Sequence, residues 1–445
     1  MADVTFVGGT IVTAGGPVRG DVAVEDGRIA GIGPLDAAGH TVDATGLLVF
    51  PGMVDTHVHL MDPGPTERED FPTGTRAASA RGVTTIVEHT HAHPIRSVAD
   101  LEEKRAHLRT RSNVDFGLAA HVWPDRIGEI PALWAAGVTF FKIFTCTTHG
   151  VPGIDPAHLL DAFSAIGSVD GRTLVHCEDE SITAQAERVL RDQGRDDPGI
   201  LLDWRNREAE LVAIAAAAVL ADHTGVKATF AHVSSPEVIE VIESARAWGA
   251  DIAAEACPQY FALFEDEVLT EGPLRKFTPP ARIRSEVDRD RMWDAVRSGA
   301  FSHFSTDHAP STLAQKGQGG IWDAPFGLPG IDTTFPFLLD AALSGRIGLE
   351  DVARLYSLAP AVRYGLAPRK GAIAVGADAD LVLVDPEAAW TVSDADVLSK
   401  AGWSPYSGTT FRGRVVATFL RGEEIARDGT PHDARTGRFL AGAGA

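Results

Sequence analysis

The middle of this 445-residue chain alternates between apolar, β-branched runs and stretches with helical character. Most of the runs are followed by a helical stretch, such as residues 73–81 and 236–248. The runs span residues 54–59, 83–88, 114–121, 138–143, 173–177, 228–233, 251–256 and 301–306. Eight βα units in series predict a closed parallel barrel, so we expect an α/β protein built on a (β/α)8, TIM-like barrel.

Both ends of the chain have a different residue pattern from the middle. Residues 3–50 hold short β-rich runs separated by turn pairs such as Gly8-Gly9, and similar runs return at residues 380–384 and 415–420. Neither end alone has enough strands to be stable, so we expect one small β-sandwich made from both. The predicted domains are residues 1–50 (sandwich, first part), 51–370 (catalytic barrel) and 371–445 (sandwich, second part, and tail).

The composition narrows the kinds of molecule that this protein is expected to bind. The chain has 40 basic and 61 acidic residues, a formal net charge of -21, which disfavours nucleic acid and anionic membranes as partners. The N-terminal sequence MADVTFVGGTIV lacks the pattern of a secretory signal, and no apolar run is long enough for a membrane helix. Three scattered cysteines, Cys146, Cys177 and Cys257, agree with a reducing compartment. We therefore expect a cytoplasmic protein with a small-molecule site.

Polar residues of metal-ligand type stand at the ends of the predicted strands, where a parallel barrel has its active site. His57 and His59 share one face of the first run, about 7 Å apart along the chain. The full set is His57, His59, Lys142, His176, His232 and Asp307. Any one of these residues alone is more often structural, whereas the set together favours a metal site.

Lys142 lies among Phe140, Phe141 and Ile143. A lysine in such surroundings can simply pair with a carboxylate, but desolvation also favours its neutral amine. A neutral amine can add CO₂, and the resulting carbamate has two oxygens that can bridge two divalent ions. Asp307 can act as a helix cap or, opposite two cations, as an ionised ligand.

Short motifs follow one another in the same order as in a known group of enzymes. They are residues 51–60 (PGMVDTHVHL), 141–144 (FKIF), 175–178 (VHCE), 232–235 (HVSS), 255–260 (EACPQY) and 305–308 (STDH). This pattern resembles the cyclic amidohydrolases of the amidohydrolase superfamily: hydantoinases, dihydropyrimidinases, allantoinases and dihydroorotases. The resemblance covers nearly the whole chain, including both parts of the sandwich.

The resemblance implies a site with two divalent metal ions. His57, His59 and Asp307 would hold one ion, His176 and His232 the other, and N6-carboxylated Lys142 would bridge them. Zn²⁺ is the expected metal, with Mn²⁺, Co²⁺ or Fe²⁺ as alternatives. A metal-bridging hydroxide would attack the cyclic amide, and Asp307 would pass its proton to the departing nitrogen. A dimer or tetramer is also implied.

The residues that distinguish substrates point away from dihydroorotate. Dihydroorotases resembling this pattern have an arginine where this chain has Met61, so the carboxylate of dihydroorotate would lose its partner. Hydantoinases tend to have a tyrosine at the position of Thr147. The resemblance is nearest to the allantoinase and hydantoinase branches, with hydantoin-like, allantoin-like or cyclic-imide substrates. Met61 itself suggests a rather apolar substituent pocket.

Further residues are candidates for substrate binding or gating. By resemblance, Thr278, Phe326 and Gly327 would contact the substrate amide. His91 belongs to a group with His89 and His93 whose spacing fits either a polar pocket mouth or a third metal site. The glycine-rich residues 310–329 could form a mobile lid.

Three other functions remain open from the sequence alone. The first is dihydroorotase or dihydropyrimidinase activity. The second is a mononuclear deaminase of the same superfamily, against which Lys142 argues. The third is a catalytically inactive dihydropyrimidinase-like scaffold, which the complete ligand set disfavours.

Overall fold

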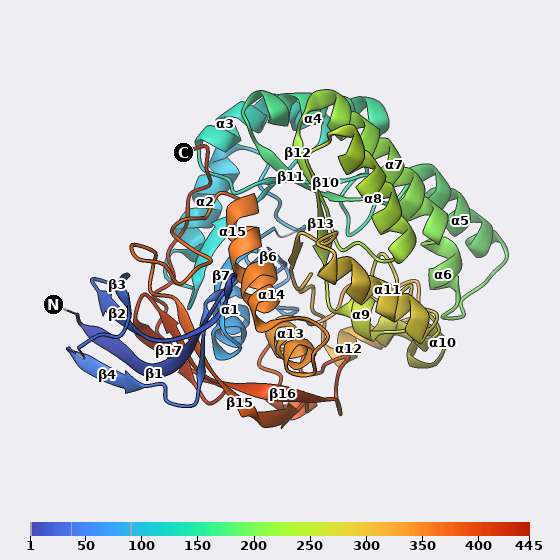
Figure 1. The fold of residues 1–445 in the computed structure, drawn as a ribbon. Coiled ribbons are helices and arrows are strands. Elements are labelled where there is room, and N and C mark those ends of the chain that lie inside the picture. Colours follow the sequence, from blue (N-terminus) through green and yellow to red (C-terminus); the bar gives the residue numbers. More distant parts are fainter. Residues whose placement is uncertain (1, 37, 90) are drawn as a thin grey trace.

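The computed structural model describes residues 2–36, 38–89 and 91–445. Its central feature is a parallel barrel with helices around the outside (Figure 1). The barrel strands are β6 (Met53–Val58), β7 (Val83–Glu88), β8 (Asp115–Leu118), β9 (Ala120–His121), β10 (Phe141–Phe144), β11 (Arg172–His176), β12 (Lys227–Phe230), β13 (Ile252–Ala256) and β14 (His303–Phe304). Each of the eight predicted runs overlaps a strand, and the predicted (β/α)8 fold is confirmed.

The barrel closes through two irregular joints. Only Ala119 separates β8 from β9, and its backbone N–H donates to the carbonyl of Glu88 at 3.0 Å. At the other joint, the backbone N–H of His59 donates to the carbonyl of His308 at 2.8 Å. Next to it, the Asp55 carboxylate accepts from the backbone N–H of Thr306 at 3.1 Å. The end of β6 is thereby fixed beside the segment that follows β14.

Complete burial explains why the barrel strands appear in the sequence as nearly continuous apolar runs. Every residue of β6, β7 and β10 is buried, as expected for parallel strands that are covered on both faces. The polar residues among them therefore stand out, since each must find a partner inside the barrel.

In space the helices lie outside the barrel, and along the chain they stand between the strands. Several begin at a side chain that caps them, such as Asp70, which accepts from Thr73 N–H at 2.8 Å. None of the helices in the described part is both long and apolar enough to cross a membrane. They are α1 (Phe71–Ala80), α2 (Val98–Leu108), η1 (Pro124–Glu129), α3 (Ile130–Ala135), α4 (Pro156–Ser168), α5 (Glu180–Asp192), α6 (Ile200–Trp204), α7 (Arg207–Thr224), α8 (Pro236–Trp248), α9 (Gln259–Ala262), α10 (Glu267–Glu271), η2 (Gly272–Arg275), α11 (Glu286–Arg297), α12 (Leu313–Lys316), α13 (Thr334–Leu343), α14 (Leu349–Ala353), η3 (Arg354–Leu358), α15 (Ala359–Arg363) and η4 (Asp394–Asp396).

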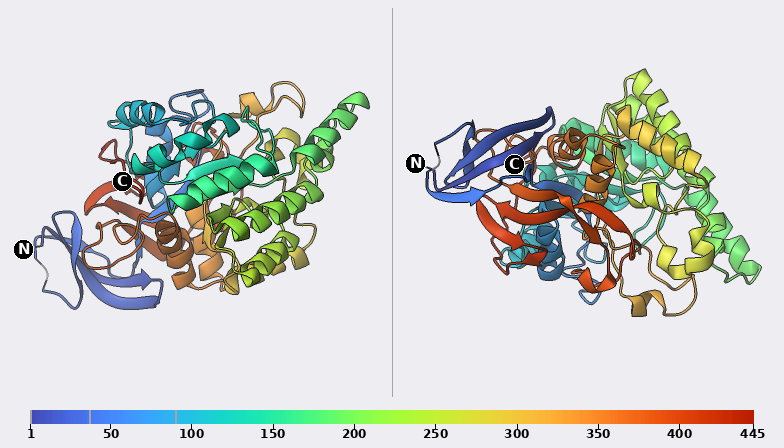
Figure 2. Two further views of the ribbon diagram at one scale, coloured as in Figure 1. Left: turned by 90° about the horizontal axis from the view of Figure 1, so that it is seen from above. Right: turned by 60° about the horizontal axis from the view of Figure 1, so that its bottom comes forward.

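Both chain ends build one β-rich domain, as predicted. Its strands form a single nine-stranded sheet in which β5 pairs antiparallel with β15, and its core includes the rings of Phe6 and Phe419, whose centroids are 4.8 Å apart. Figure 2 shows the strands of the N-terminal part (blue) next to those of the C-terminal part (red). The strands are β1 (Val4–Thr13), β2 (Gly16–Glu25), β3 (Arg28–Gly33), β4 (His40–Asp43), β5 (Leu48–Pro51), β15 (Leu381–Thr391), β16 (Thr410–Leu420), β17 (Glu423–Arg427) and β18 (Thr430–Pro431).

Past β18 the chain leaves this sheet and returns to the barrel. Backbone hydrogen bonds join Leu440 to Phe116 at 2.8 Å and Gly442 to Gly137 at 2.9 Å. The Leu440 side chain is 3% exposed. The tail therefore belongs to the packing of the barrel, at the end of β8 that lies away from the site.

Candidate metal centre

The ends of five barrel strands bring the six predicted ligand residues together. His57 and His59 stand at the end of β6, Lys142 lies in β10, His176 ends β11, and His232 and Asp307 follow β12 and β14. The side chain of Asp307 is 13% exposed, and the other five are almost completely buried. Residues that are far apart in sequence thus meet at the carboxyl end of the barrel.

Three of these residues meet Lys142 in one half of the site. The Nε2 atom of His57 lies 3.1 Å from Oδ1 of Asp307, and Nε2 of His59 lies 3.4 Å from the same oxygen. The Nζ atom of Lys142 is 3.4 Å from Nε2 of His57. In the other half, Nδ1 of His176 faces Nε2 of His232 at 3.0 Å.

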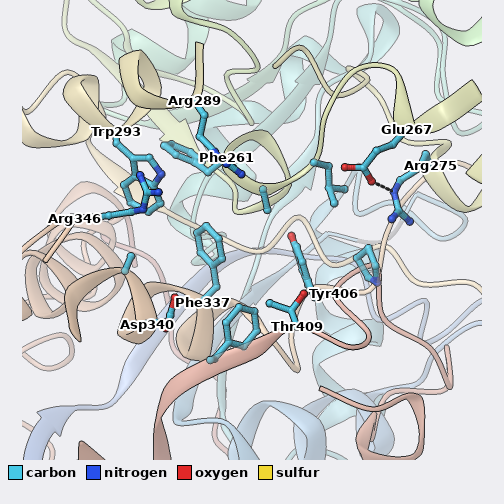
Figure 3. A pocket seen from close by; sticks show the side chains of 15 residues that line it. Phe261, Glu267, Arg275, Arg289, Trp293, Phe337, Asp340, Arg346, Tyr406 and Thr409 are labelled. Carbon is cyan, nitrogen blue, oxygen red and sulfur yellow. Dashed lines mark hydrogen bonds and ion pairs between the residues drawn. The ribbon is translucent and has the colours of Figure 1, made fainter. Parts of the chain in front are cut away.

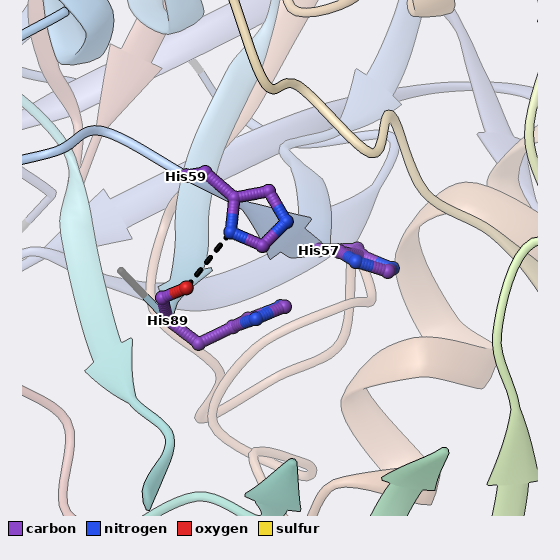
Figure 4. A group of neighbouring side chains, drawn as sticks. All are labelled: His57, His59 and His89. Atoms are coloured by element: carbon purple, nitrogen blue, oxygen red, sulfur yellow. Dashed lines mark hydrogen bonds between the residues drawn. The ribbon is translucent and has the colours of Figure 1, made fainter. Parts of the chain in front are cut away.

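Hydrogen bonds at the far side of three of the four imidazoles fix which nitrogen can bind a cation. Nδ1 of His57 donates to the Glu255 carboxylate at 2.7 Å, and Nδ1 of His59 donates to the backbone carbonyl of His89 at 2.8 Å (Figure 4). Nε2 of His176 donates to the Glu178 carboxylate at 2.9 Å. A neutral imidazole has one donor, so the inward nitrogens carry lone pairs. These lone pairs, aimed at each other and at a carboxylate oxygen, fit divalent cations between them.

The electrostatics of the buried site favour the forms that bind metal. Burial lowers the pKa of Lys142 to about 8, although Glu255 and Asp307 act in the opposite direction. Burial also lowers the pKa of His59 to about 4. For Asp307, burial alone would raise the pKa, but the histidines around it hold it below its ordinary value. At neutral pH Asp307 is therefore a carboxylate and His59 a neutral imidazole.

The backbone at the site is strained at three non-glycine residues. Met61, His232 and Asp307 have φ angles of 55°, 37° and 49°. Positive φ is unfavourable for such side chains and is found where surrounding structure imposes it, commonly at functional sites. At His232 and Asp307 it accompanies a sharp turn directly after a strand, and both side chains belong to the candidate metal centre.

Two carboxylates complete the site although the sequence reasoning gave them no role. Oε1 of Glu255 accepts from Nδ1 of His57 and also from the backbone N–H of His232 at 3.0 Å. Oε2 of Glu178 accepts from His176, from Thr278 Oγ1 at 2.7 Å and from Arg205 at 3.3 Å. Their signal was available, since Glu255 is an acidic residue within the apolar strand β13 and Glu178 follows the end of β11 by two residues.

The predicted substrate-binding residues occupy different positions. Met61 is buried next to the ligands, and Thr278 reaches the site through Glu178 rather than directly. Phe326 lies near the mouth, with its ring 5.7 Å from that of His149. Gly327 has a φ of 111° and its backbone N–H donates to the Lys276 carbonyl at 3.1 Å. Thr147 is exposed, and its hydroxyl accepts from the backbone N–H of Gly153 at 3.2 Å.

The three histidines after β7 do not share one face, because the strand ends at Glu88. His89 is buried beside the ligands, and His91 lies with its ring 4.2 Å from that of His59. His93 is exposed and lines a separate surface pocket. Within the described residues, ligand-type atoms of His89 gather with those of His57 and His59, whereas His91 and His93 join no such group.

The glycine-rich segment 310–329 is held over the site by cations that donate to backbone carbonyls. Arg68 reaches the carbonyls of Pro310 and Phe326, at 3.1 and 3.4 Å. Lys316 donates to Pro325 at 2.9 Å. Lys276 donates to two further carbonyls of the segment, at 2.6 and 2.9 Å. A segment fixed at several points is better suited to shaping the site than to free movement, and its role as a lid stays a prediction.

A separate pocket of about 360 Å³ lies between the barrel helices and the β-rich domain (Figure 3). Aromatic rings, among them Trp293, Phe337 and Tyr406, form its walls. Arg275 on its rim is paired with Glu267 at 2.7 Å. None of the candidate ligands lines this pocket, so it is distinct from the metal centre.

Comparison with known proteins agrees with this geometry. The sequence profile of the Amidohydrolase family matches residues 48–425. The chain is 37% identical to an allantoinase of Solibacter usitatus, over 96% of this chain and 94% of that protein. An allantoinase of Rubrobacter xylanophilus is 36% identical, over 98% and 97% of the two chains.

Solved structures give the same relationship. The L-hydantoinase (dihydropyrimidinase) of Arthrobacter aurescens has a TM-score of 0.93 and 28% identity, with 99% of this chain and 100% of that chain covered. A D-hydantoinase has a TM-score of 0.90 and 31% identity, with 98% of both chains covered. With a family profile that spans most of its length and relatives that cover nearly all of it, this chain belongs to the amidohydrolase family.

Proposed function

We propose that this protein is a metal-dependent hydrolase that opens the ring of a cyclic amide of the allantoin or hydantoin type. The observation that carries the proposal is the convergence of four buried histidines with Asp307 and Lys142 at one end of the barrel. The relatives named allantoinase and hydantoinase support the reaction class.

The donor set fits two divalent ions. His57, His59 and Asp307 would hold one, His176 and His232 the other, and N6-carboxylated Lys142 would bridge them. Zn²⁺ suits this mixture of imidazole and carboxylate ligands, and Mn²⁺, Co²⁺ and Fe²⁺ are alternatives. Such ions supply acidified water and a polarised amide carbonyl. Nε2 of His57, which carries a lone pair, lies 3.1 Å from Oδ1 of Asp307. Two such atoms come this close only with a cation or a proton between them.

Residues of the chain itself would transfer the proton of the attacking water. Asp307 is ionised and stands at the centre of the site, so it is placed to accept a proton from the attacking water and deliver it to the departing ring nitrogen. Glu255 and Glu178 keep the imidazoles oriented while this happens. The lining of the site excludes bulk water, because nearly all of these side chains are buried.

Allantoin-like or hydantoin-like rings fit better than dihydroorotate. Met61 offers no charge to a ring carboxylate, and the nearby guanidinium of Arg205 is already paired with Glu178 at 3.3 Å. Dihydropyrimidinase activity is a weaker candidate, since the sequence relatives described above are named allantoinase. The expected assembly is a homo-oligomer, a dimer or tetramer, and the expected location is the cytoplasm.

Purified protein should be tested for ring opening with allantoin, hydantoin, dihydrouracil, dihydroorotate and a cyclic imide, alongside metal analysis. We expect about two metal equivalents per chain and the highest kcat/KM with allantoin or hydantoin. One equivalent with release of ammonia would indicate a deaminase. No metal and no ring opening would indicate an inactive scaffold, and a preference for dihydroorotate would refute the substrate assignment.

A further inference from the structure

One oxygen of the buried Glu255 carboxylate contacts both halves of the candidate metal centre, whereas the other oxygen has no hydrogen bond. Oε1 accepts from Nδ1 of His57 at 2.7 Å and from the backbone N–H of His232 at 3.0 Å. Oε2 is buried and has no hydrogen-bond partner in the part of the chain that the structure describes. A buried oxygen of this kind has given up its hydrogen bonds to water, so it needs a donor inside the barrel.

The strand register places His303 directly beside Glu255. β13 and β14 are parallel neighbours in which Glu255 is paired with His303. Paired residues of neighbouring strands direct their side chains to the same face of the sheet. Because Glu255 points into the barrel toward His57, His303 points there too. Nε2 of His303 lies 3.7 Å from Oε2 of Glu255, on the side of the carboxylate that has no other partner.

His303 is itself a buried residue in need of a partner. It is 0% exposed, and among the described residues neither of its ring nitrogens has a hydrogen-bond partner. Its ring meets the ring of Tyr364 edge-on, with the centroids 5.7 Å apart and the planes at 89°. Packing against this ring would be served as well by an apolar side chain, which buries no nitrogen. The contact with Glu255 exceeds an ordinary hydrogen bond by about 0.7 Å, so a small shift of either side chain closes it.

We propose that His303 is a positioning residue of the metal centre, whose Nε2–H donates to Oε2 of Glu255 and fixes the orientation of this carboxylate. The inference rests on the metal-binding part of the proposed function. Within the described residues, no hydrogen bond or ion pair joins His303 to a candidate ligand, so its effect passes through Glu255. With Oε2 held, the carboxylate cannot rotate, and Oε1 stays in contact with His57 and with the backbone of His232.

Removal of the donor at residue 303 should weaken metal binding at both candidate positions. His303→Leu keeps a similar side-chain volume but leaves Oε2 of Glu255 without a donor. We expect Zn²⁺ to bind about tenfold more weakly at both positions, the effect of one lost hydrogen bond, in a titration of the metal-loaded protein against a chelator. His303→Gln carries an amide N–H in place of Nε2–H and should restore the affinity to within about threefold of the wild type.

A double variant tests whether the effect passes through Glu255. Glu255→Gln alone should weaken binding about 10- to 100-fold. If His303 acts only by holding this carboxylate, His303→Leu combined with Glu255→Gln should bind Zn²⁺ as Glu255→Gln does, to within about threefold. A merely structural role predicts instead that the two effects multiply, because a damaged barrel weakens binding whichever residue stands at position 255.

Thr139→Val is the matched control, because it also removes a buried polar group that has no hydrogen-bond partner among the described residues. Thr139 lies just before β10, and its variant should bind Zn²⁺ as the wild type does. The melting temperature of every variant is measured, so that loss of folding is recognised separately. If His303→Leu does not fold, His303→Asn takes its place, since the shorter amide does not reach Oε2 of Glu255 and should weaken binding likewise.

The outcomes separate this inference from the proposed function. Wild-type protein that binds no divalent metal refutes both. Unchanged affinity in His303→Leu, affinity in His303→Gln as weak as in His303→Leu, or multiplied effects in the double variant would refute the positioning role alone. The expected pattern of affinities in a protein that opens no cyclic amide would refute the ring-opening function and support the positioning role, because chelator titration needs no substrate.

Discussion

The strongest quantitative prediction concerns the neutral amine of Lys142 in metal-free protein. An ordinary lysine with a pKa of 10.5 is neutral in about one molecule in 3000 at pH 7, whereas a pKa of about 8 makes it neutral in about one in ten. Burial inside the barrel, where Nζ lies 5.0 Å from the centre of the Phe144 ring, therefore increases the amine available to CO₂ by about 300-fold at this pH. Carboxylation should consequently proceed near neutral pH.

The assay follows carboxylation of metal-free protein at a fixed concentration of ¹³C-labelled CO₂, by the carbamate carbonyl signal in NMR. Since only the neutral amine reacts, the rate should rise about tenfold per pH unit up to about pH 8 and then level off. A rate that keeps rising to pH 10 would refute the argument, because it would indicate an ordinary lysine. Lys142→Arg should give no signal at this position.

Three further predictions concern other parts of the molecule. Glu255→Gln should weaken metal binding about 10- to 100-fold at both ions, measured by titration against a chelator; an effect on one ion alone would contradict the shared contact. Asp307→Asn should lower kcat at least about a hundredfold, in a steady-state assay with allantoin, and a near-normal kcat would remove its role in proton transfer. Leu440→Ala should lower the free energy of unfolding by about 2–4 kcal/mol in urea titration, because Leu440 is buried against the barrel; an unchanged midpoint would mean that the tail does not contribute to packing.

The fold and the six candidate ligands were accessible to sequence reasoning because of one regularity. In a parallel barrel the ends of successive strands lie together. A polar residue that ends an apolar run is therefore expected at this end of the barrel from the sequence alone. His57, His176 and His232 were found in this way, although they are far apart in the chain. The unbroken apolar character of the runs also reflects burial on both faces, which makes them easy to recognise.

Other features depend on contacts that no local pattern contains. The role of Glu255 needs the distance between β13 and β6, and that of Arg205 needs the position of α6 relative to β11. The short extent of β7 decides that His89, His91 and His93 diverge, because side chains alternate only as long as the strand continues. No local pattern indicates that the tail leaves the sheet and packs on the barrel.

The single oxygen of Glu255 that contacts both halves of the site has an evolutionary consequence. It holds the ring of His57 and, 3.0 Å away, the backbone of His232, so both candidate metal positions depend on one side chain. A substitution there would disturb the two positions together. Evolution could therefore not alter one candidate metal position alone by substitution at residue 255, and such a change would have to begin at a ligand instead.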